Sequence, residues 1–525
     1  MRSTFMGLET SKRGMFTQQT ALYTTGHNLS NANTIGYSRQ RVNMEATTPY
    51  PGIGLNSGTA PGFIGTGSQA HSVQRIRDQF VDRQFRQEAN SLGYWDTKAK
   101  AISQMEDVLN EPTEFGINET LDLFWKSLSL VGADPQSAGT RNVAIERGVN
   151  AAESFNHVHK QIFDLQLDVK SEINISTLDV NSILKQIAEL NHSIQKIEPN
   201  GYMPNDLYDA RDVLIDELAQ YFPIEVSYRK TGGNSLAIAE GIVDISIKTK
   251  TDSIKVVEGK EASQLAHNMA PNNSTDPFQN FTIKSGPSAG TIITQDMMLP
   301  GNGTMLSHID SYGYDNGKGP EGMYPDMLKQ LNEMAKEFAE KFNEVHKQGF
   351  GLQTEETDPI TGLPVIDPIT GLPVMKDSET GHSFFAGGPP ITANNIVVNQ
   401  DILDDPNKFA ASSAINEEGN GDNAFLLAGV KDVPIINCAS VQTYYETLIG
   451  GVGVKGEQAN RMAETSATKL LTIANGRAQV SSVSVDEEMT NMITFQQAYN
   501  ASARMLTAVD EVLDRIINGM GRVGQ

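Results

Sequence analysis

Three short patterns in this sequence have residue types and spacings that could support chemistry. The segment 451–456, Gly-Val-Gly-Val-Lys-Gly, matches the G-x-G-x-x-G fingerprint of dinucleotide-binding loops, but the fingerprint requires a preceding strand, and here helical patterns flank it. His157 and His159 lie two apart on an expected helix, where side chains diverge by about 200° and cannot easily share a metal ion. The acidic segments 310–322 and 416–423 do not match the calcium-loop pattern. We interpret all three patterns as structural.

Other signals of catalysis are absent from the sequence. It contains no G-x-S-x-G, H-E-x-x-H or P-loop motif, and its carboxylates are too numerous to single out a glycosidase pair. Cys438 is the single cysteine, which excludes an intramolecular disulfide and a cysteine-based zinc site. We therefore expect no catalytic, cofactor-binding or metal-binding residues, and we expect a protein that is not an enzyme.

The charge balance limits the class of partner. The 525 residues carry a formal net charge of −23, with a pI of about 4.8. This charge argues against nucleic acid or an anionic membrane as a partner. The first thirty residues lack the apolar core of a signal peptide, and no apolar run approaches the roughly 18 residues of a membrane helix. These rules alone would predict a cytoplasmic protein.

The two ends of the chain carry helical patterns. Near the C-terminus, apolar residues recur at spacings of three and four, interrupted only by Ser502: Met492, Phe495, Tyr499, Leu506, Val509, Leu513 and Ile516. Near the N-terminus, four apolar residues recur every seven positions: Leu8, Met15, Leu22 and Leu29. The positions that would complete this seam are small or polar: Ser11, Gln18, Thr25 and Ala32. We predict that the apolar residues of both ends form an assembly interface.

The charges of the two ends are complementary. Residues 1–41 carry a net charge of +4, whereas residues 484–517 carry −4. Burying one Leu or Phe contributes roughly 1.5–3 kcal/mol, and isolated helices are marginal, so we expect both ends to be poorly ordered in the monomer and to order on assembly. An ordinary helical hairpin that closes a globular domain is the alternative.

The interior alternates between helical and strand patterns. Helical periodicity predicts helices at about 78–110, 118–131, 135–199, 204–220 and 322–348. Alternating apolar residues after Ile224 predict a mainly β region at 222–310. Residues 349–400 are loop-rich and contain Asp-Pro-Ile-Thr-Gly-Leu-Pro-Val twice, at 358–365 and 367–374. Beyond residue 406 the chain becomes helical again, with an expected Gly-rich interruption at 450–456.

These patterns predict an α+β fold. A long α-helical bundle or coiled-coil frame is made from both chain ends, and a mainly β middle region is inserted into it. The expected domains are 1–48 with 475–525 for axial packing, 70–221 with 405–474 as a discontinuous helical domain, 222–310 as a β domain, and 311–404 as a helix followed by loops.

The chain ends resemble a known group of proteins. The segment Asn28-Leu-Ser-Asn-Ala-Asn-Thr-Ile-Gly-Tyr37-Ser-Arg-Gln is similar to the N-terminal signature of bacterial flagellar rod, hook and hook-associated proteins, and 484–510 resembles their closing helix. Within the group, the length and the pattern at 205–218 resemble the hook-associated protein 1 family, the first hook–filament junction proteins.

This resemblance implies a structural adaptor of the extracellular flagellum that joins hook to filament. Implied partners are hook subunits, the second junction protein, further copies in a ring, and a flagellar export chaperone at the C-terminal helix. The resemblance also implies secretion through the type III apparatus without a cleaved signal, which replaces the cytoplasmic prediction. A hook or rod subunit, and a secreted enzyme with docking helices at its ends, are the alternatives.

Overall fold

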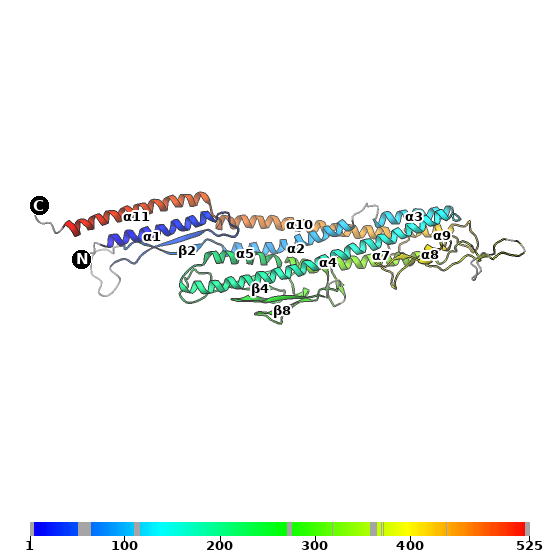
Figure 1. Ribbon diagram of the computed structural model, residues 1–525, viewed down its shortest axis with the longest axis horizontal. Coiled ribbons are helices and arrows are strands. Elements are labelled where there is room, and N and C mark those ends of the chain that lie inside the picture. The colour runs from blue at the N-terminus through cyan, green and yellow to red at the C-terminus, as the bar shows by residue number, and fades with distance from the viewer. Residues whose placement is uncertain are drawn as a thin grey trace.

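The molecule is a long rod with the two terminal helices at one end and loops at the other (Figure 1). The computed structural model describes residues 5–50, 65–109, 116–269, 276–317, 319–356, 365–368, 370, 372–436 and 438–519. In this described part, none of the helices has an apolar stretch of the length that a bilayer crossing needs. The predicted α+β architecture, a helical frame with an inserted β region, is confirmed.

Five helices build the frame at the centre of the rod, and the predicted segments are confirmed. They are α2 (Gln79–Leu109), α3 (Ile117–Ala133), α4 (Ala138–Ile197), α5 (Asn205–Tyr221) and α10 (Val441–Ser481). Two further helices are α6 (Thr304–Tyr312) and α7 (Met323–His346). Five apolar residues on one face of α7 are buried: Met327, Leu331, Met334, Phe338 and Phe342.

Helix α4 forms the spine, because its 60 residues extend for about 90 Å. Ser137 caps its first turn by accepting a hydrogen bond from the Thr140 N–H at 3.4 Å. At its far end, Gly201 takes a left-handed conformation (φ 86°) after the short helix Glu198–Asn200. Four apolar residues on one face of its second half are buried: Val180, Ile183, Ile187 and Ile194.

The Gly-rich segment 450–456 is helical, and the expected interruption is wrong. Helix α10 runs through it without a break and packs against α2. A Cβ on Gly456 would lie 2.5 Å from the Glu106 carboxylate and 3.1 Å from Ile102 Cγ2, so glycine permits this close approach. Helix α10 ends only at Ser481, and the next helix begins at Val485. The domain boundary expected at 474/475 therefore falls inside α10.

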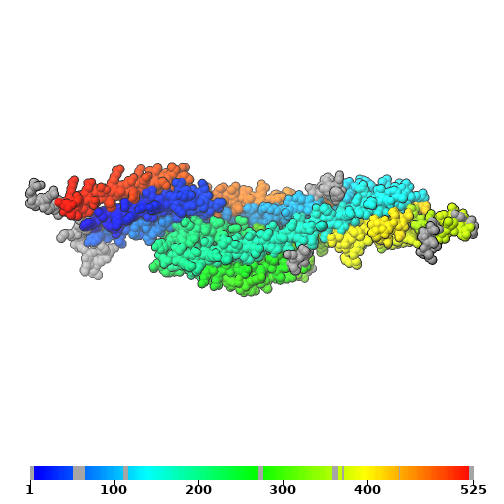
Figure 2. All heavy atoms as spheres, viewed as in Figure 1, coloured from blue at the N-terminus to red at the C-terminus, as the bar shows by residue number. Residues whose placement is uncertain are grey.

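The β region protrudes from one side of the rod (Figure 2). Its first sheet has the order β3-β4-β5-β6 and is antiparallel. The strands are β3 (Ile224–Arg229), β4 (Ile242–Lys248), β5 (Ser253–Glu258) and β6 (Glu261–Ala262). A second sheet joins β7 (Gln264–Asn268), β8 (Asn280–Ser285) and β9 (Ile292–Ile293). Inward residues such as Val243, Ile245 and Ile247 are buried, which confirms the predicted strand alternation.

The loop-rich end contains short elements only. They are β12 (Thr354–Glu355), β13 (Met375–Lys376), β14 (Phe385–Ala386), β15 (Val397–Val398), α8 (Gln400–Asp404) and α9 (Asp422–Gly429). The short hairpin of β10 (Tyr314–Asp315) and β11 (Pro320–Glu321) lies instead beside the β region, where Tyr314 bridges to Phe278. The first copy of the tandem repeat lies outside the described residues except for Val365.

The end of the rod that carries the terminal helices is called the stalk, and the rest of the rod is called the body. The stalk contains a β-hairpin that the sequence reasoning missed. It pairs β1 (Gln40–Ala46) with β2 (Ser68–Arg75) and lies beside the terminal helix α1 (Met6–Ser30). The other terminal helix, α11 (Val485–Gly519), packs against α1. Thr17 of α1 donates a 3.0 Å hydrogen bond to the Ser68 carbonyl of β2. The hairpin therefore connects the first helix to the body.

Two glycines of α10 test the helix packing. We predict that Gly456→Leu lowers the free energy of unfolding by about 1–3 kcal/mol, because a side chain there overpacks the α2 contact. Gly451→Leu is the matched control: it meets no atom within 4 Å, and it should be neutral or stabilise the helix. Urea unfolding measures both, and equal effects of the two substitutions would contradict this packing.

Candidate assembly surface

The two terminal helices pack antiparallel through small residues of α1. A Cβ on Gly7 would lie 3.5 Å from Val509, and one on Gly14 would lie 3.3 Å from the Ser502 hydroxyl. Asn28 donates a hydrogen bond to Glu488 further along. Positions 7, 14, 21 and 28 form one stripe, and its Ala21 is buried. Small side chains on this stripe let the helices approach closely, which accounts for the polar interruption at Ser502.

The predicted interface residues lie beside this contact and are mostly half-buried. Leu8, Met15, Leu22 and Leu29 each follow one position after the stripe of small residues, and all four remain partly exposed. On α11, only Leu513 is buried, and the others are partly exposed: Met492, Phe495, Tyr499, Leu506, Val509 and Ile516. Their role in assembly, and the mobility of both helices in the monomer, stay predictions.

A buried asparagine closes the base of the terminal pair. The Asn28 side chain donates to the Gln40 carbonyl (2.8 Å) and to Glu488 (3.2 Å). Its oxygen accepts from the Gln40 N–H (2.9 Å) and from the Tyr37 hydroxyl (2.8 Å). Its hydrogen-bonding groups are therefore used to tie α1 to the start of β1 and to α11. Asn28 and Tyr37 belong to the N-terminal signature segment.

Arg39 supplies ion pairs between the two ends. Its Nε lies 2.8 Å from Glu488 and its Nη1 lies 2.7 Å from Glu487, while its main-chain N–H donates to the Ser481 carbonyl. Lys12 and Arg41 make no ion pair with α11 within the described residues. The opposite charges of the two ends therefore meet at the base of the pair, and the outer turns keep their charges for other contacts.

A buried arginine–carboxylate cluster joins this stalk to the body. It comprises Arg75, Arg77, Arg86, Arg211, Arg477, Asp82, Asp209, Asp212, Asp216 and Glu240. Arg75, the last residue of β2, is 5% exposed. Its Nη1 lies 2.6 Å from Asp209, and its Nη2 lies 3.0 Å from Asp212 and 2.5 Å from Glu240.

The same cluster holds three helices together. Oδ1 of Asp82, on α2, forms ion pairs with Arg77 Nη2 at 2.9 Å and with Nε of Arg477, on α10, at 2.8 Å. Asp216, on α5, forms ion pairs through Oδ1 with Nε of Arg86, on α2, at 2.7 Å and through Oδ2 with Arg477 Nη2 at 2.7 Å. Each of these carboxylates therefore bridges arginines from different segments, so α2, α5 and α10 are linked at the point where the stalk begins.

The central carboxylate of the cluster is held ionised by its neighbours. Burial alone would raise the pKa of Asp212, but Arg77, Arg75 and two further arginines outweigh it and hold the pKa below its usual range. Asp209 shows the reverse balance, because burial raises its pKa more than Arg75 and Ser38 lower it. Asp212 is therefore the carboxylate whose charge contributes most clearly to stability.

The cluster was missed by sequence reasoning, although its α5 residues lie in the pattern at 205–218. Its members come from five separate segments between residues 75 and 477. Arg75 and Arg77, close to Asp78 and Asp82, resemble an ordinary solvated run of charges. One feature of the sequence could have indicated the cluster. Arg211 and Asp212 place charges on the buried face of the amphipathic helix α5, and Asp216 follows one turn later.

The residues considered for chemistry take structural positions. His157 is exposed beside a cavity of about 840 Å³ between α3 and α4. His159 is half-buried, and burial lowers its pKa. Across the described ranges, no group of three or more His, Cys, Asp or Glu residues is placed to hold a metal ion.

Comparisons with known proteins agree with this architecture. The family described as the flagellar hook-associated protein FlgK helical domain matches residues 102–360, and that described as the flagellar basal body rod FlgEFG protein C-terminal matches residues 474–519. The chain is 44% identical over 540 residues to flagellar hook-associated protein 1 of Bacillus subtilis (strain 168), covering 100% of each chain. The chain belongs to the flagellar hook-associated protein 1 family.

More distant members share the full length. Flagellar hook-associated protein 1 of Escherichia coli (strain K12) is 24% identical, covering 96% of this chain and 98% of that protein. The solved structure of the flagellar hook junction protein FlgK from Burkholderia pseudomallei matches with a TM-score of 0.57 and 12% identity, over 77% of this chain and 100% of that one, and shows the same fold. As a family member, this chain has a structural role at the flagellar hook–filament junction.

Neutralising the central carboxylate tests the cluster. We predict that Asp212→Asn lowers the free energy of unfolding by about 3–5 kcal/mol, because buried arginines lose their shared counterion. Glu217→Gln, an exposed position on the same helix, is the matched control and should change it by less than about 0.5 kcal/mol. Urea unfolding measures both. A loss no larger for Asp212→Asn than for the control would refute the role of the cluster.

Acid should weaken the same cluster. Because the pKa of Asp212 is lowered on folding, its contribution is fully present above the unfolded carboxyl pKa of about 3.9 and is lost as the pH falls below it. We predict that the stability difference between wild type and Asp212→Asn shrinks between about pH 7 and pH 3. Unfolding midpoints across this range measure it, and a difference independent of pH would contradict the account.

Proposed function

We propose that this chain joins hook to filament by polymerising through its paired terminal helices. The observation that carries the proposal is the large apolar surface on the outer faces of the pair. Phe5, which directly precedes α1, and Phe16 and Tyr23 on α1 are 58%, 51% and 70% exposed. On α11, five apolar residues are more than half exposed: Met489, Ile493, Met505, Val512 and Ile517. Exposed apolar surface of this extent is typical of a protein interface.

The distal end of the pair supports a lateral contact between copies. A groove of about 300 Å³ lies where Gly7 faces α11, lined by Gly7, Ala508, Val509, Val512, Leu513 and Ile516. The exposed carboxylates Asp510, Glu511 and Asp514 lie on the same part of α11, whereas α1 presents Lys12 beside Phe16. A neighbouring α1 therefore offers both an aromatic side chain and an opposite charge, and the charge would set register more than strength.

The proposed partners are those of an axial junction protein. One end of an assembled ring of copies binds hook subunits, and the other binds the second junction protein. Before assembly, the apolar stripe of α11 binds a flagellar export chaperone as an amphipathic helix in a groove. The half-buried state of Leu506 and Val509 supports this role, because a chaperone can reach them by displacing one helix, α1.

We also propose that the chain is secreted to the extracellular part of the flagellum and is not an enzyme. The arrangement of charge supports the second point, because each carboxylate of the buried cluster is paired with an arginine. The structural role of the family supports both points.

A charge placed in the α11 stripe tests the proposal. We predict that Leu506→Asp abolishes junction assembly while the body stays folded, because the carboxylate enters an interface that excludes water. Filament formation in cells carrying the variant, together with unfolding of the purified chain, measures the two effects.

Leu178→Asp is the matched control. It makes the same substitution at a residue of α4 that is 69% exposed and lies outside the terminal helices. Filaments should form normally in this variant. Normal assembly of Leu506→Asp, or equal loss of assembly in both variants, would refute assembly through the terminal stripe.

A further inference from the structure

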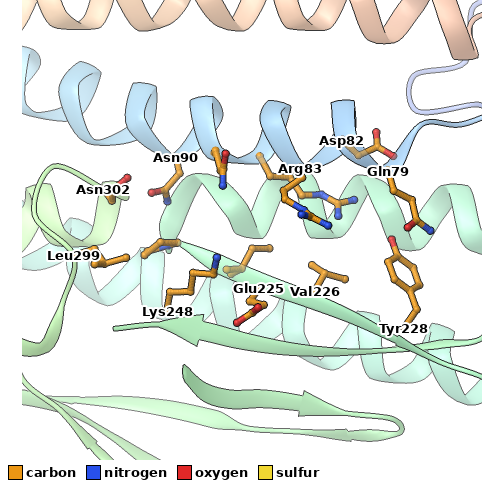
Figure 3. Close-up of a pocket in the computed structure, with 14 residues that line it drawn as sticks. Gln79, Asp82, Arg83, Asn90, Glu225, Val226, Tyr228, Lys248, Leu299 and Asn302 are labelled. Atoms are coloured by element: carbon orange, nitrogen blue, oxygen red, sulfur yellow. The ribbon is translucent and has the colours of Figure 1, made fainter. Parts of the chain in front are cut away.

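A groove lies between α2 and the first sheet, on the side of the body. It has a volume of about 510 Å³. One wall is a face of α2 that includes Gln79, Arg83 and Gln87, and the other wall is β3 with Lys248 at the end of β4. Figure 3 shows Gln79 and Arg83 extending from α2 toward β3, with Val226 and Lys248 on the opposite side.

Strand β3 is an edge strand, and its open edge lines this groove. The sheet order places β4 on its other side, and the Lys248 N–H donates to the Pro223 carbonyl at 2.8 Å. In an antiparallel ladder, residues that bond to the partner strand alternate with residues whose N–H and C=O point away from it. Pro223 bonds to β4, so the next residue and every second one after it point their main-chain groups away from β4. These residues are Ile224, Val226 and Tyr228, and all three line the groove. Their main-chain groups have no hydrogen-bond partner at this edge within the described residues.

The opposite wall offers polar side chains at matching spacing. Gln79, Arg83 and Gln87 recur every four residues, lie on one face of α2 and are exposed. The wall from Gln79 to Asn90 is about 16 Å long, which is close to the length of five extended residues. The groove therefore has the length of a short strand, with main-chain groups on one side and side-chain amides on the other.

The charge of the groove favours an acidic occupant. Arg83 and Lys248 line it, and neither makes an ion pair in the part of the chain that the structure describes. The other arginine of the wall, Arg86, is paired with Asp216 in the buried cluster. Two carboxylates also line the groove: Asp82 is paired with Arg77 and Arg477, and Glu225 accepts a hydrogen bond from the Ser253 hydroxyl at 3.2 Å. The cations that remain available therefore outnumber the carboxylates.

We propose that this groove binds an extended, acidic peptide segment of another protein, which adds to the first sheet as a strand beside β3. The open N–H and C=O groups of β3 would supply the main-chain hydrogen bonds, as in recognition by strand addition. Arg83 and Lys248 would bind a carboxylate of the segment. This site lies on the body, and its occupation does not depend on assembly through the terminal helices.

Peptide binding to the purified full chain tests the site. The probe is a fluorescein-labelled, end-blocked hexapeptide, Thr-Val-Glu-Val-Thr-Val, and its counterpart carries Lys in place of Glu. We expect saturable binding of the Glu peptide by fluorescence anisotropy, with about tenfold weaker binding of the Lys peptide. Arg83→Glu should weaken binding of the Glu peptide by about tenfold and strengthen binding of the Lys peptide.

A proline substitution separates main-chain recognition from charge. Val226→Pro removes an N–H from the open edge and leaves the ladder with β4 intact, because that N–H points away from β4. It should weaken binding about tenfold. Because Val226 also packs against the core, Val226→Ala, which loses this packing but keeps the N–H, is the reference and should bind normally. In hydrogen exchange, the Glu peptide should slow the amides of β3. Lys100→Glu, an exposed charge reversal on α2 outside the groove, is the control and should bind normally.

Three results would overturn the proposal. The first is no saturable binding of the Glu peptide at millimolar concentration. The second is binding that is indifferent to both Arg83→Glu and Val226→Pro. The third is protection of the β3 amides by self-association of the chain without peptide, which would make a second copy the occupant. Normal filament assembly by Val226→Pro would separate this site from the terminal interface.

Discussion

The buried arginines between the terminal helices and the rest of the rod are paired with carboxylates, and removing one partner would leave a buried charge uncompensated. Arg75 ends the hairpin of the stalk, and Arg477 lies near the end of α10 just before the chain enters α11. Both reach carboxylates on the same helix, α5. Because neither arginine can leave without exposing an unpaired buried charge, the hairpin, α10 and the body hold a fixed relation to one another. The terminal helices continue from that fixed point.

The terminal pair itself follows a different physical rule. Its contact is built from small and polar side chains, with Gly14 facing Ser502 and Asn28 bonded to Glu488, so the pair is close but buries little apolar surface. The large apolar side chains are left on the flanks and outer faces, where further copies could bury them. A pair that is specific in register but buries little apolar surface is what the proposed gain of stability on assembly requires.

The sequence predicted local periodicity well and long-range pairing poorly. The helices of the frame and the alternating strands after Ile224 followed from spacing, because these features depend on neighbours within one element. The continuity of α10 through 450–456 did not follow from spacing, because a glycine-rich segment suggests a helix break. Only the contact with Ile102 of α2 shows why a side chain is excluded at Gly456. The arginine–carboxylate cluster could not be predicted from spacing either, because no spacing rule relates Arg75 to Asp209. The stripe of α11 was visible in the sequence, whereas the contact stripe of α1 was not, because its small residues lie one position before the apolar residues that drew attention.

The most direct test of a junction role uses a strain that lacks this gene. Cells would be imaged by electron microscopy, and flagellin would be quantified on the cells and in the medium. The account predicts complete hooks without filaments, with flagellin lost to the medium, because the hook is finished before the junction is built. Normal filaments, or the absence of hooks, would contradict it.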